Sequence, residues 1–299
     1  MRRQRLHGFT LVELVIVIAL LSIISLVTVG FITSSMQGYA DVKRRDQLSS
    51  AARVAVERMA REVRNALPNS IRISADNTCL EFIPTVAASR YMAIPTSGAT
   101  PSNSFSAVAF AVPPVFNTGR VAVYPIDSNN LDEAHVGNPI YDVDANSIIS
   151  PILTSTSAEL APVPTPASGV ITVNLNAVHN FPTGSPSNRF FIVEEPVSFC
   201  VVGTDLYRFQ GEGSAYTYTP VQANAASLFS QLGEPNRAIL ASDIINPPNN
   251  TPFRYVESVL QRNGLVLFDL FVEDQIVGVD DRVQENIQVQ FDVQVRNVP

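Results

Sequence analysis

A single carboxylate stands at the entrance of the longest apolar stretch in the sequence. Glu13 precedes the run from Leu14 to Ile32, and the next charged residue is Asp41. As a helix this run is about 28 Å long, which nearly fills the ~30 Å hydrocarbon layer of a membrane. A carboxylate at that depth is costly unless a cation neutralises it. The pattern therefore predicts a membrane span, and Glu13 is the detail that separates it from an ordinary one.

The sequence contains few other residue patterns that are typical of a catalytic or ligand-binding site. The sequence has no G-x-S-x-G elbow, H-E-x-x-H pair or phosphate-binding glycine loop. His135 and His179 are isolated among polar or loop residues, and we interpret both as solvated. We therefore predict no catalytic residue, no cofactor and no small-molecule substrate, so the chain is not expected to be an enzyme.

One acidic segment imitates the start of a calcium loop. Asp142 and Asp144 have the right spacing, but Ser147 stands in place of the required Gly, and Leu153 in place of the closing Glu. We interpret the segment as a solvated acidic loop and predict no metal. An irregular calcium site that uses these residues or the Asp280-Asp281 turn is the alternative.

Composition narrows the class of protein further. The chain has 299 residues, of which 46% are hydrophobic and 16% are charged, so it is not a disordered polyelectrolyte. Its formal net charge is −7. Nucleic-acid binding requires clustered Lys and Arg, so this charge disfavours it.

The residues after the apolar run have the period of an amphipathic helix. Apolar side chains recur at spacings of three and four, while oppositely charged pairs such as Arg58 and Glu62 are four apart on the other face. Pro68 ends the pattern. We predict one helix over residues 9–67, with residues 14–32 in the membrane. The apolar face is predicted to comprise Leu48, Ala52, Ala55, Met59, Val63 and Ala66.

Beyond Ser70 the period changes to about two, which is typical of strands. The pattern predicts an alternating strand at Ile287–Arg296, a central strand at Gly264–Val272 and a hairpin of Val197–Val202 with Asp205–Gln210. The fold class predicted is α+β, with the long helix packed on a mainly antiparallel sheet.

Residues 68–299 are thus predicted to form a β-rich head. Two regions of the head, residues 84–169 and 211–250, are rich in Pro, Ser, Thr and Asn, and we interpret them as loop-like insertions. Within the first, the only strands predicted are Phe105–Val112 and Arg120–Tyr124.

The N-terminal residues carry a more specific pattern. A basic leader with Arg2, Arg3 and Arg5 is followed by Gly8-Phe9-Thr10-Leu11-Val12-Glu13 and then by the apolar run. This order resembles the class III signal of type IV pilin-like precursors. A conventional secretory signal has a shorter apolar region and a small-residue cleavage site, and a plain signal anchor does not explain Glu13.

The resemblance implies how the chain is processed and where it resides. A prepilin peptidase would remove residues 1–8 by cutting between Gly8 and Phe9, and would methylate the new N-terminus at Phe9. Glu13 would pair with the N-terminal ammonium of a neighbouring subunit. The chain would cross the inner membrane once, with its head in the periplasm. Its partners would be other major and minor pilins and the inner-membrane assembly platform.

The size of the head and its motifs resemble the minor subunits of this family. Residues 52–66 look like the helix of J-type minor pseudopilins and W-type minor pilins. Cys79–Pro84 and the ending Asn297-Val298-Pro299 look like a minor pilin of the mannose-sensitive haemagglutinin (MSHA) pilus system. This implies a low-copy subunit that starts or caps a pilus. A J-type pseudopilin of a type II secretion system and a membrane-anchored periplasmic binding protein are the alternatives.

Two further features depend on this resemblance. Four arginines, Arg53, Arg58, Arg61 and Arg64, form a basic helix face that we expect to contact acidic surfaces of other minor subunits. A solvated charged face is the alternative.

Cys79 and Cys200 would lie in the periplasm, which permits disulfides. Each lies in a predicted strand and shares its face with a polar residue, Glu81 or Ser198. We expect a bond between the two cysteines, with two separate buried thiols as the alternative.

Overall fold

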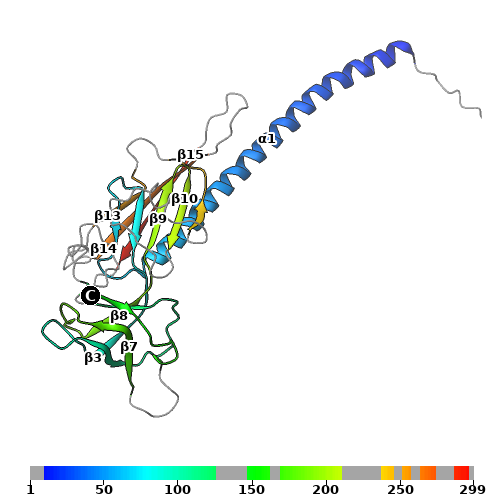
Figure 1. Cartoon of the computed structure of the whole chain (residues 1–299). Coiled ribbons are helices and arrows are strands. Elements are labelled where there is room, and N and C mark those ends of the chain that lie inside the picture. Colours follow the sequence, from blue (N-terminus) through cyan, green and yellow to red (C-terminus); the bar gives the residue numbers. More distant parts are fainter. Residues whose placement is uncertain are drawn as a thin grey trace, which may run out of the picture. The chain divides into compact units, whose positions relative to one another are not determined.

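The structure of the chain is a computed structural model (Figure 1). In the residues that it describes, one long helix is followed only by strands. The described residues are 10–125, 147–161, 169–210, 237–245, 251–256, 263–273 and 286–295. The chain divides into two compact units, residues 1–49 and residues 50–299. The strands pair antiparallel in three sheets, which confirms the predicted α+β class.

Helix α1 runs without interruption over Leu11–Val63. It passes through Gly30 and Gly38, where, apart from the helix's own backbone, no atom of the described residues lies within 4 Å of the place that a Cβ would take. Three hydroxyl residues in the apolar run or directly after it, Ser22, Thr28 and Thr33, turn their side chains back onto the helix. Each donates a hydrogen bond of 2.7–2.8 Å to the carbonyl four residues earlier, so these polar groups are satisfied inside the helix.

The predicted helix end at residue 67 is wrong, because the last turn is replaced by pairing with the sheet. The Leu67 N–H donates to the Ile83 carbonyl at 2.7 Å, and the Thr85 N–H donates to the Asn65 carbonyl at 2.7 Å. The helix therefore ends at Val63, before Pro68 could terminate it. Its buried face within the second unit matches the predicted stripe from Ala52 onward and consists of Ala52, Ala55, Val56, Met59, Ala60 and Val63.

The first sheet contains five strands in the order β1-β2-β9-β10-β11. The predicted hairpin is confirmed residue by residue: β9 is Val197–Val202, β10 is Asp205–Gln210, and Gly203 takes a φ of 63° in the turn. The helix is tied to this sheet by an ion pair of 2.8 Å between Glu62 and Arg208 of β10. The remaining strands are β1 (Arg72–Ile73), β2 (Cys79–Phe82) and β11 (Arg237–Ala241).

The second sheet contains β12 (Ile244–Ile245), β13 (Phe253–Val256), β14 (Gly264–Glu273) and β15 (Asn286–Val295). As predicted, β14 is central, with β15 along one edge and β12 and β13 along the other. A Cβ at Gly264 would lie 2.9 Å from the Tyr255 hydroxyl, so a larger residue there would displace the Tyr255 ring. Strands β11 and β12 also show that the predicted loop-like region 211–250 contains regular structure.

The third sheet curls into a small barrel. Its strand order is β6-β5-β8-β3-β4-β7. The two edges meet where Leu153 and Leu175 form a bridge and the Thr154 N–H donates to the Asn174 carbonyl at 2.9 Å. Buried side chains, among them Phe105, Phe181 and Phe190, fill its interior. The strands are β3 (Thr85–Ala93), β4 (Ser102–Val108), β5 (Arg120–Val123), β6 (Ile149–Ile152), β7 (Val170–His179) and β8 (Arg189–Val193).

Two strands in the region 84–169 contradict the prediction that only two segments there are strands. In β3, Ala and Ser replace the bulky residues that make a period of two visible. In β6, Pro151 cannot donate to a strand ladder, which argues against a strand in the sequence. The pairing of β5 with β6 has a register shift between Arg120 and Ala122, the kind of irregularity at which a strand tolerates Pro, and there the Ser150 hydroxyl accepts the Val121 N–H at 2.9 Å.

Candidate processing and docking site

The N-terminal end of α1 places Glu13 in a capping arrangement. The Glu13 N–H donates to Thr10 Oγ1 at 3.3 Å, and the Leu14 N–H donates to the Thr10 carbonyl at 3.3 Å. Thr10 is therefore the N-cap, and Glu13 is the acidic residue of a T-x-x-E capping sequence. At this position the partial positive charge of the helix N-terminus favours the carboxylate. The predicted cleavage residues Gly8 and Phe9 lie outside the described residues.

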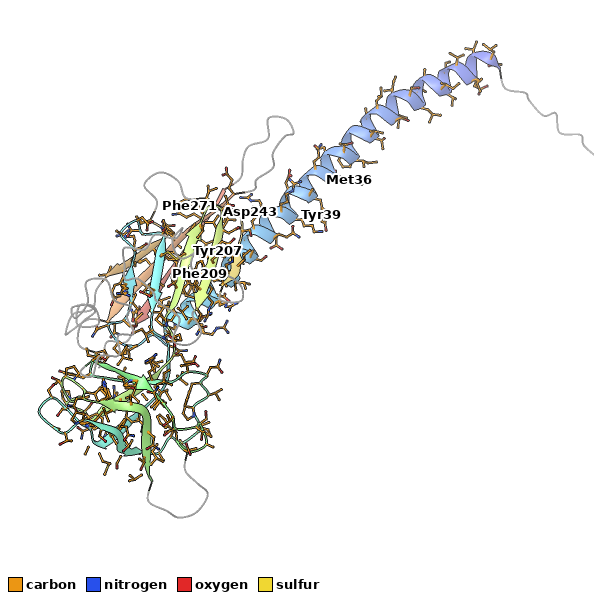
Figure 2. All side chains as sticks on the ribbon, viewed as in Figure 1. Met36, Tyr39, Tyr207, Phe209, Asp243 and Phe271 are labelled. Atoms are coloured by element: carbon orange, nitrogen blue, oxygen red, sulfur yellow. A yellow bond between two sulfur atoms is a disulfide. The ribbon has the colours of Figure 1, made fainter. Side chains whose placement is uncertain are left out.

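The apolar half of the helix has no covering within its unit. All residues from Thr10 to Tyr39 are exposed, for example Leu26 at 77% and Phe31 at 72%. By length and composition the helix is able to cross a membrane. Exposed apolar surface of this extent requires lipid or other apolar helices around it. Beyond this run, Met36 and Tyr39 also project freely from the helix (Figure 2).

The four arginines of the predicted interaction face are all exposed, but they are not equivalent. Arg58 Nε lies 3.2 Å from Glu62 Oε1, which confirms the predicted pair, and the other oxygen of Glu62 binds Arg208. Arg58 thus takes part in an ion-pair network within the chain. Arg53, Arg61 and Arg64 form no ion pair with any described residue. The docking role of the face stays a prediction.

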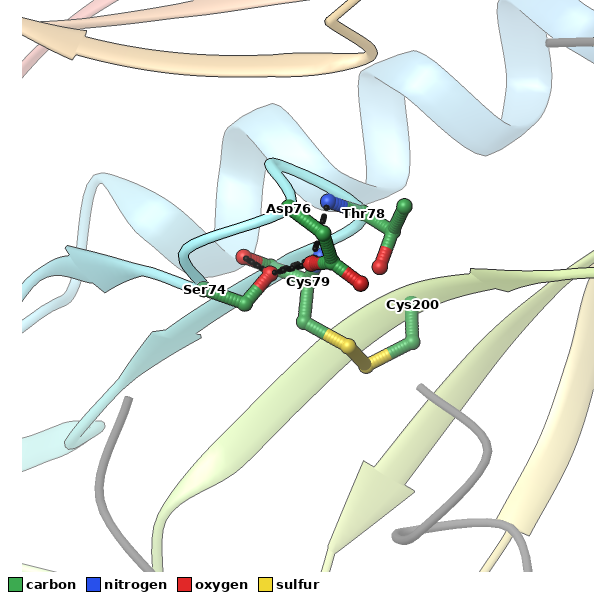
Figure 3. Close-up of a disulfide and its surroundings, with 5 residues drawn as sticks. All are labelled: Ser74, Asp76, Thr78, Cys79 and Cys200. Carbon is green, nitrogen blue, oxygen red and sulfur yellow. Dashed lines mark hydrogen bonds between the residues drawn. A yellow bond between two sulfur atoms is a disulfide. The ribbon is translucent and has the colours of Figure 1, made fainter. Parts of the chain in front are cut away.

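Cys79 and Cys200 form a disulfide, as expected (Figure 3). They are direct partners in the pairing of β2 with β9, their Cα atoms are 4.2 Å apart, and both side chains are buried. Glu81 and Ser198, the polar neighbours recognised in the sequence, are also cross-strand partners. Glu81 forms a buried ion pair with Arg72 of β1, which supplies the opposite charge that a buried carboxylate needs.

A hydrogen-bonded turn that the sequence reasoning missed sets the position of Cys79. Ser74 Oγ donates to Asp76 Oδ1 at 2.6 Å and accepts the Cys79 N–H at 2.9 Å, while the Thr78 N–H donates to Asp76 Oδ1 at 3.2 Å (Figure 3). Burial alone would raise the pKa of Asp76, but the hydrogen bonds from Ser74 and Thr78 outweigh it and lower the pKa. The sequence signal for this turn was the series Ser-Ala-Asp-Asn-Thr, because Ser, Asp and Asn are typical turn residues. In the structure Asn77 has a φ of 58°, which Asn tolerates.

The prediction that His179 is solvated is wrong. Its side chain is fully buried at the end of β7, its Nε2 lies 2.9 Å from the Ser147 carbonyl, and its ring meets Phe181 edge to face at 4.6 Å. Burial lowers its pKa, while the contact with the Ser147 carbonyl opposes that shift. The sequence could not show this, because the inward direction of His179 depends on barrel closure.

The other residues considered for metal binding lie outside the described residues: His135, Asp142, Asp144, Asp280 and Asp281. Within the part of the chain that is described, no three His, Cys, Asp or Glu side chains are grouped so that they could hold a metal ion.

Comparison with protein-family models finds the prokaryotic N-terminal methylation motif over residues 3–29. The motif supports a type IV pilin-like protein. It covers residues 3–8 of the predicted leader, Phe9 after the predicted cleavage position, Glu13 and most of the apolar run, and it implies processing by a prepilin peptidase and pilin partners. Together with the exposed apolar helix, it indicates that this pilin-like chain is anchored in a membrane. The chain matches no curated protein and no solved structure.

Proposed function

We propose that this chain is a minor pilin-like subunit that helps to initiate or cap a type IV pilus of the MSHA type. The observation that carries the proposal is the block Gly8–Glu13 followed by a helical stretch, residues 14–39, that is uncharged and fully exposed. The choice of pilus rests on the resemblance of the residues around the cysteines and of the C-terminus to MshO, a minor pilin-like protein of that system.

In the proposed pathway the peptidase cuts between Gly8 and Phe9, and Phe9 becomes the methylated N-terminus. The released ammonium and the Glu13 carboxylate are opposite charges that both lie at membrane depth. Each is costly there when it is alone, and pairing between neighbouring subunits removes that cost while it fixes their register. The capped position of Glu13 supports this role, because it holds the carboxylate at the start of the helix.

In this proposal α1 crosses the inner membrane once, and the head lies in the periplasm. The buried disulfide supports that placement, since disulfides persist in oxidising compartments. Residues 1–8 are the leader, residues 9–67 contain the helix and residues 68–299 form the head.

We assign the basic helix face to contacts with acidic surfaces of other minor subunits. The membrane segment would contact the inner-membrane assembly platform. Because Arg58 already binds Glu62, the three arginines at positions 53, 61 and 64 would provide most of the intermolecular contact. Reversal of Arg61 and Arg64 to Glu should reduce piliation, whereas Arg58→Gln should reduce it less. Normal piliation in the double reversal would refute the assignment.

The proposal is tested by Glu13→Ala in a piliated strain that lacks the wild-type copy. Mass spectrometry should still find the N-terminus at methylated Phe9, while sheared pili should contain little or none of the variant. Glu57→Ala, which removes an exposed carboxylate from the same helix, is the matched control. Unchanged incorporation of Glu13→Ala would contradict the docking role. Loss of protein secretion with normal pili, after deletion of the whole chain, would favour the J-type pseudopilin instead.

A further inference from the structure

Two neighbouring connections join the barrel to the five-stranded sheet. Ile83-Pro84 links β2 to β3, and Glu194-Glu195-Pro196 links β8 to β9. The connections run side by side, because Phe82 pairs with Val197 on the sheet side and Thr85 pairs with Val193 on the barrel side. Between these pairs the Glu194 N–H donates to the Pro84 carbonyl at 3.1 Å. We call the two connections the joint.

Glu195 is a buried acid within the joint. Its side chain is 5% exposed, and its Oε1 accepts no hydrogen bond from any residue in the described ranges. Two charged groups among these residues act on it: Arg120 from β5, which is also 5% exposed, and Glu194 from the same connection. Arg120 Nη1 donates to the Ser150 carbonyl at 3.4 Å, and Glu194 Oε1 accepts the Asn117 N–H at 3.0 Å.

These surroundings favour the protonated form of Glu195. Burial raises its pKa to about 7, Arg120 opposes that shift, and Glu194 adds to it. The ionised form would be a buried anion whose hydrogen-bonding capacity is not filled, which is unfavourable unless water reaches it.

A shared apolar cluster packs the barrel and the sheet together at the joint, and the Cys79–Cys200 disulfide lies on the sheet side of it. The cluster combines side chains from the helix end, from the sheet and from the barrel: Leu67, Cys79, Ile83, Ala122, Ile149, Phe191, Val193, Cys200, Tyr207 and Phe209. The disulfide fixes β2 to β9 on the sheet side. Loosening of the joint would therefore move the barrel relative to the sheet without separating β2 from β9.

We propose that the joint is pH-sensitive: the proton on Glu195 keeps the barrel and the sheet packed together, and its loss as the pH rises loosens them. An open joint lets water solvate the carboxylate, so ionisation favours opening. This inference concerns the head alone and does not depend on the proposed role in a pilus.

The test is amide hydrogen exchange of the full-length chain in detergent micelles, with wild type and Glu195→Gln compared at the same pH. Gln is neutral at every pH, so exchange in the Glu195→Gln variant measures opening of the joint when residue 195 carries no charge. At about pH 8.5, the amides of Thr85, Val193 and Glu194 should exchange up to roughly a hundredfold more slowly in the variant, whereas at about pH 4, below the ordinary pKa of a Glu side chain, the two proteins should agree. Glu57→Gln, an exposed position, should match wild type at both values. Equal exchange at the alkaline pH would overturn the proposal.

A measurement on the wild-type chain covers the case in which Glu195→Gln does not fold. In protein labelled with carbon-13 at the Glu carboxylates, one signal should titrate near pH 7, well above the ordinary Glu range of about 4.3. If all glutamates titrate below about pH 5, the joint has no such switch.

Discussion

At the scale of single residues, Thr10 links the processing motif to the helix that follows it. Its hydroxyl accepts the Glu13 N–H, so the first turn of α1 is closed by a side chain directly after the predicted cleavage position. The same residue therefore sets where the helix begins.

Thr10→Ala should fray this turn at a cost of about 1 kcal/mol, because the N-cap hydrogen bond is lost. Amide exchange at Glu13 and Leu14 in micelles measures the effect, which should be several-fold faster than in wild type. Thr10→Ser, which keeps the hydroxyl, should restore slow exchange. If Thr10→Ala exchanges like wild type, the cap does not hold the turn.

The disulfide is the strongest single-residue constraint in the head. Its cysteines are 121 residues apart, and the chain-entropy model gives more than about 4 kcal/mol for a loop of that length. The double variant Cys79→Ser/Cys200→Ser should unfold at markedly lower denaturant concentration than wild type. Ser74→Ala, which removes the hydrogen bonds of the Ser74 hydroxyl to Asp76 and to the Cys79 N–H, should shift the midpoint less. A double variant as stable as wild type would show that the bond adds nothing to the folded head.

At the scale of elements, the helix is joined to the sheet through Glu62. The carboxylate binds Arg208 of β10 and Arg58 of its own helix, and it is only partly exposed. Arg208→Ala should cost about 1 kcal/mol of unfolding free energy, and Arg58→Ala less, because helical surface pairs contribute only about 0.3–0.5 kcal/mol. A double-mutant cycle with Glu62→Ala measures both couplings. No coupling between Glu62 and Arg208 would show that the contact with the sheet is apolar alone.

The elements also show which parts of the fold the sequence could predict. The helix and the β9–β10 hairpin follow from periodicity and turn residues that are close together in the chain, and the structure confirms both. Strands β3 and β6 were missed because Ala, Ser and Pro151 hide their pattern. The barrel could not be predicted at all, since its closure depends on Leu153 meeting Leu175. In the candidate site, Glu13 and both cysteines were recognised by residue type, whereas the Ser74 turn and the burial of Glu195 required the tertiary structure.

At the scale of the whole molecule, two buried groups in the barrel and its joint make the free energy of unfolding depend on pH in opposite ways. Glu195 has a raised pKa, so the unfolded chain loses this proton first, and stability falls as pH rises from about 4.5 towards about 7. His179 has a lowered pKa, so the unfolded chain gains a proton first, and stability falls as pH drops below about 6.5. Asp76, whose pKa is lowered, adds a further loss in stronger acid, below its ordinary pKa of 3.8.

The loss of stability at higher pH and the loss at lower pH arise from different residues, Glu195 and His179, so a substitution can remove each one separately. Thermal unfolding of the full chain in micelles should show that Glu195→Gln is more stable than wild type at pH values above about 7, where wild type carries a buried charge. His179→Gln keeps a donor for the Ser147 carbonyl but cannot take up a proton, so its stability should decline less than that of wild type between about pH 6.5 and pH 5. If either variant follows the wild-type curve in its own range, the corresponding group does not control the head, and the loss there must come from other ionisable side chains.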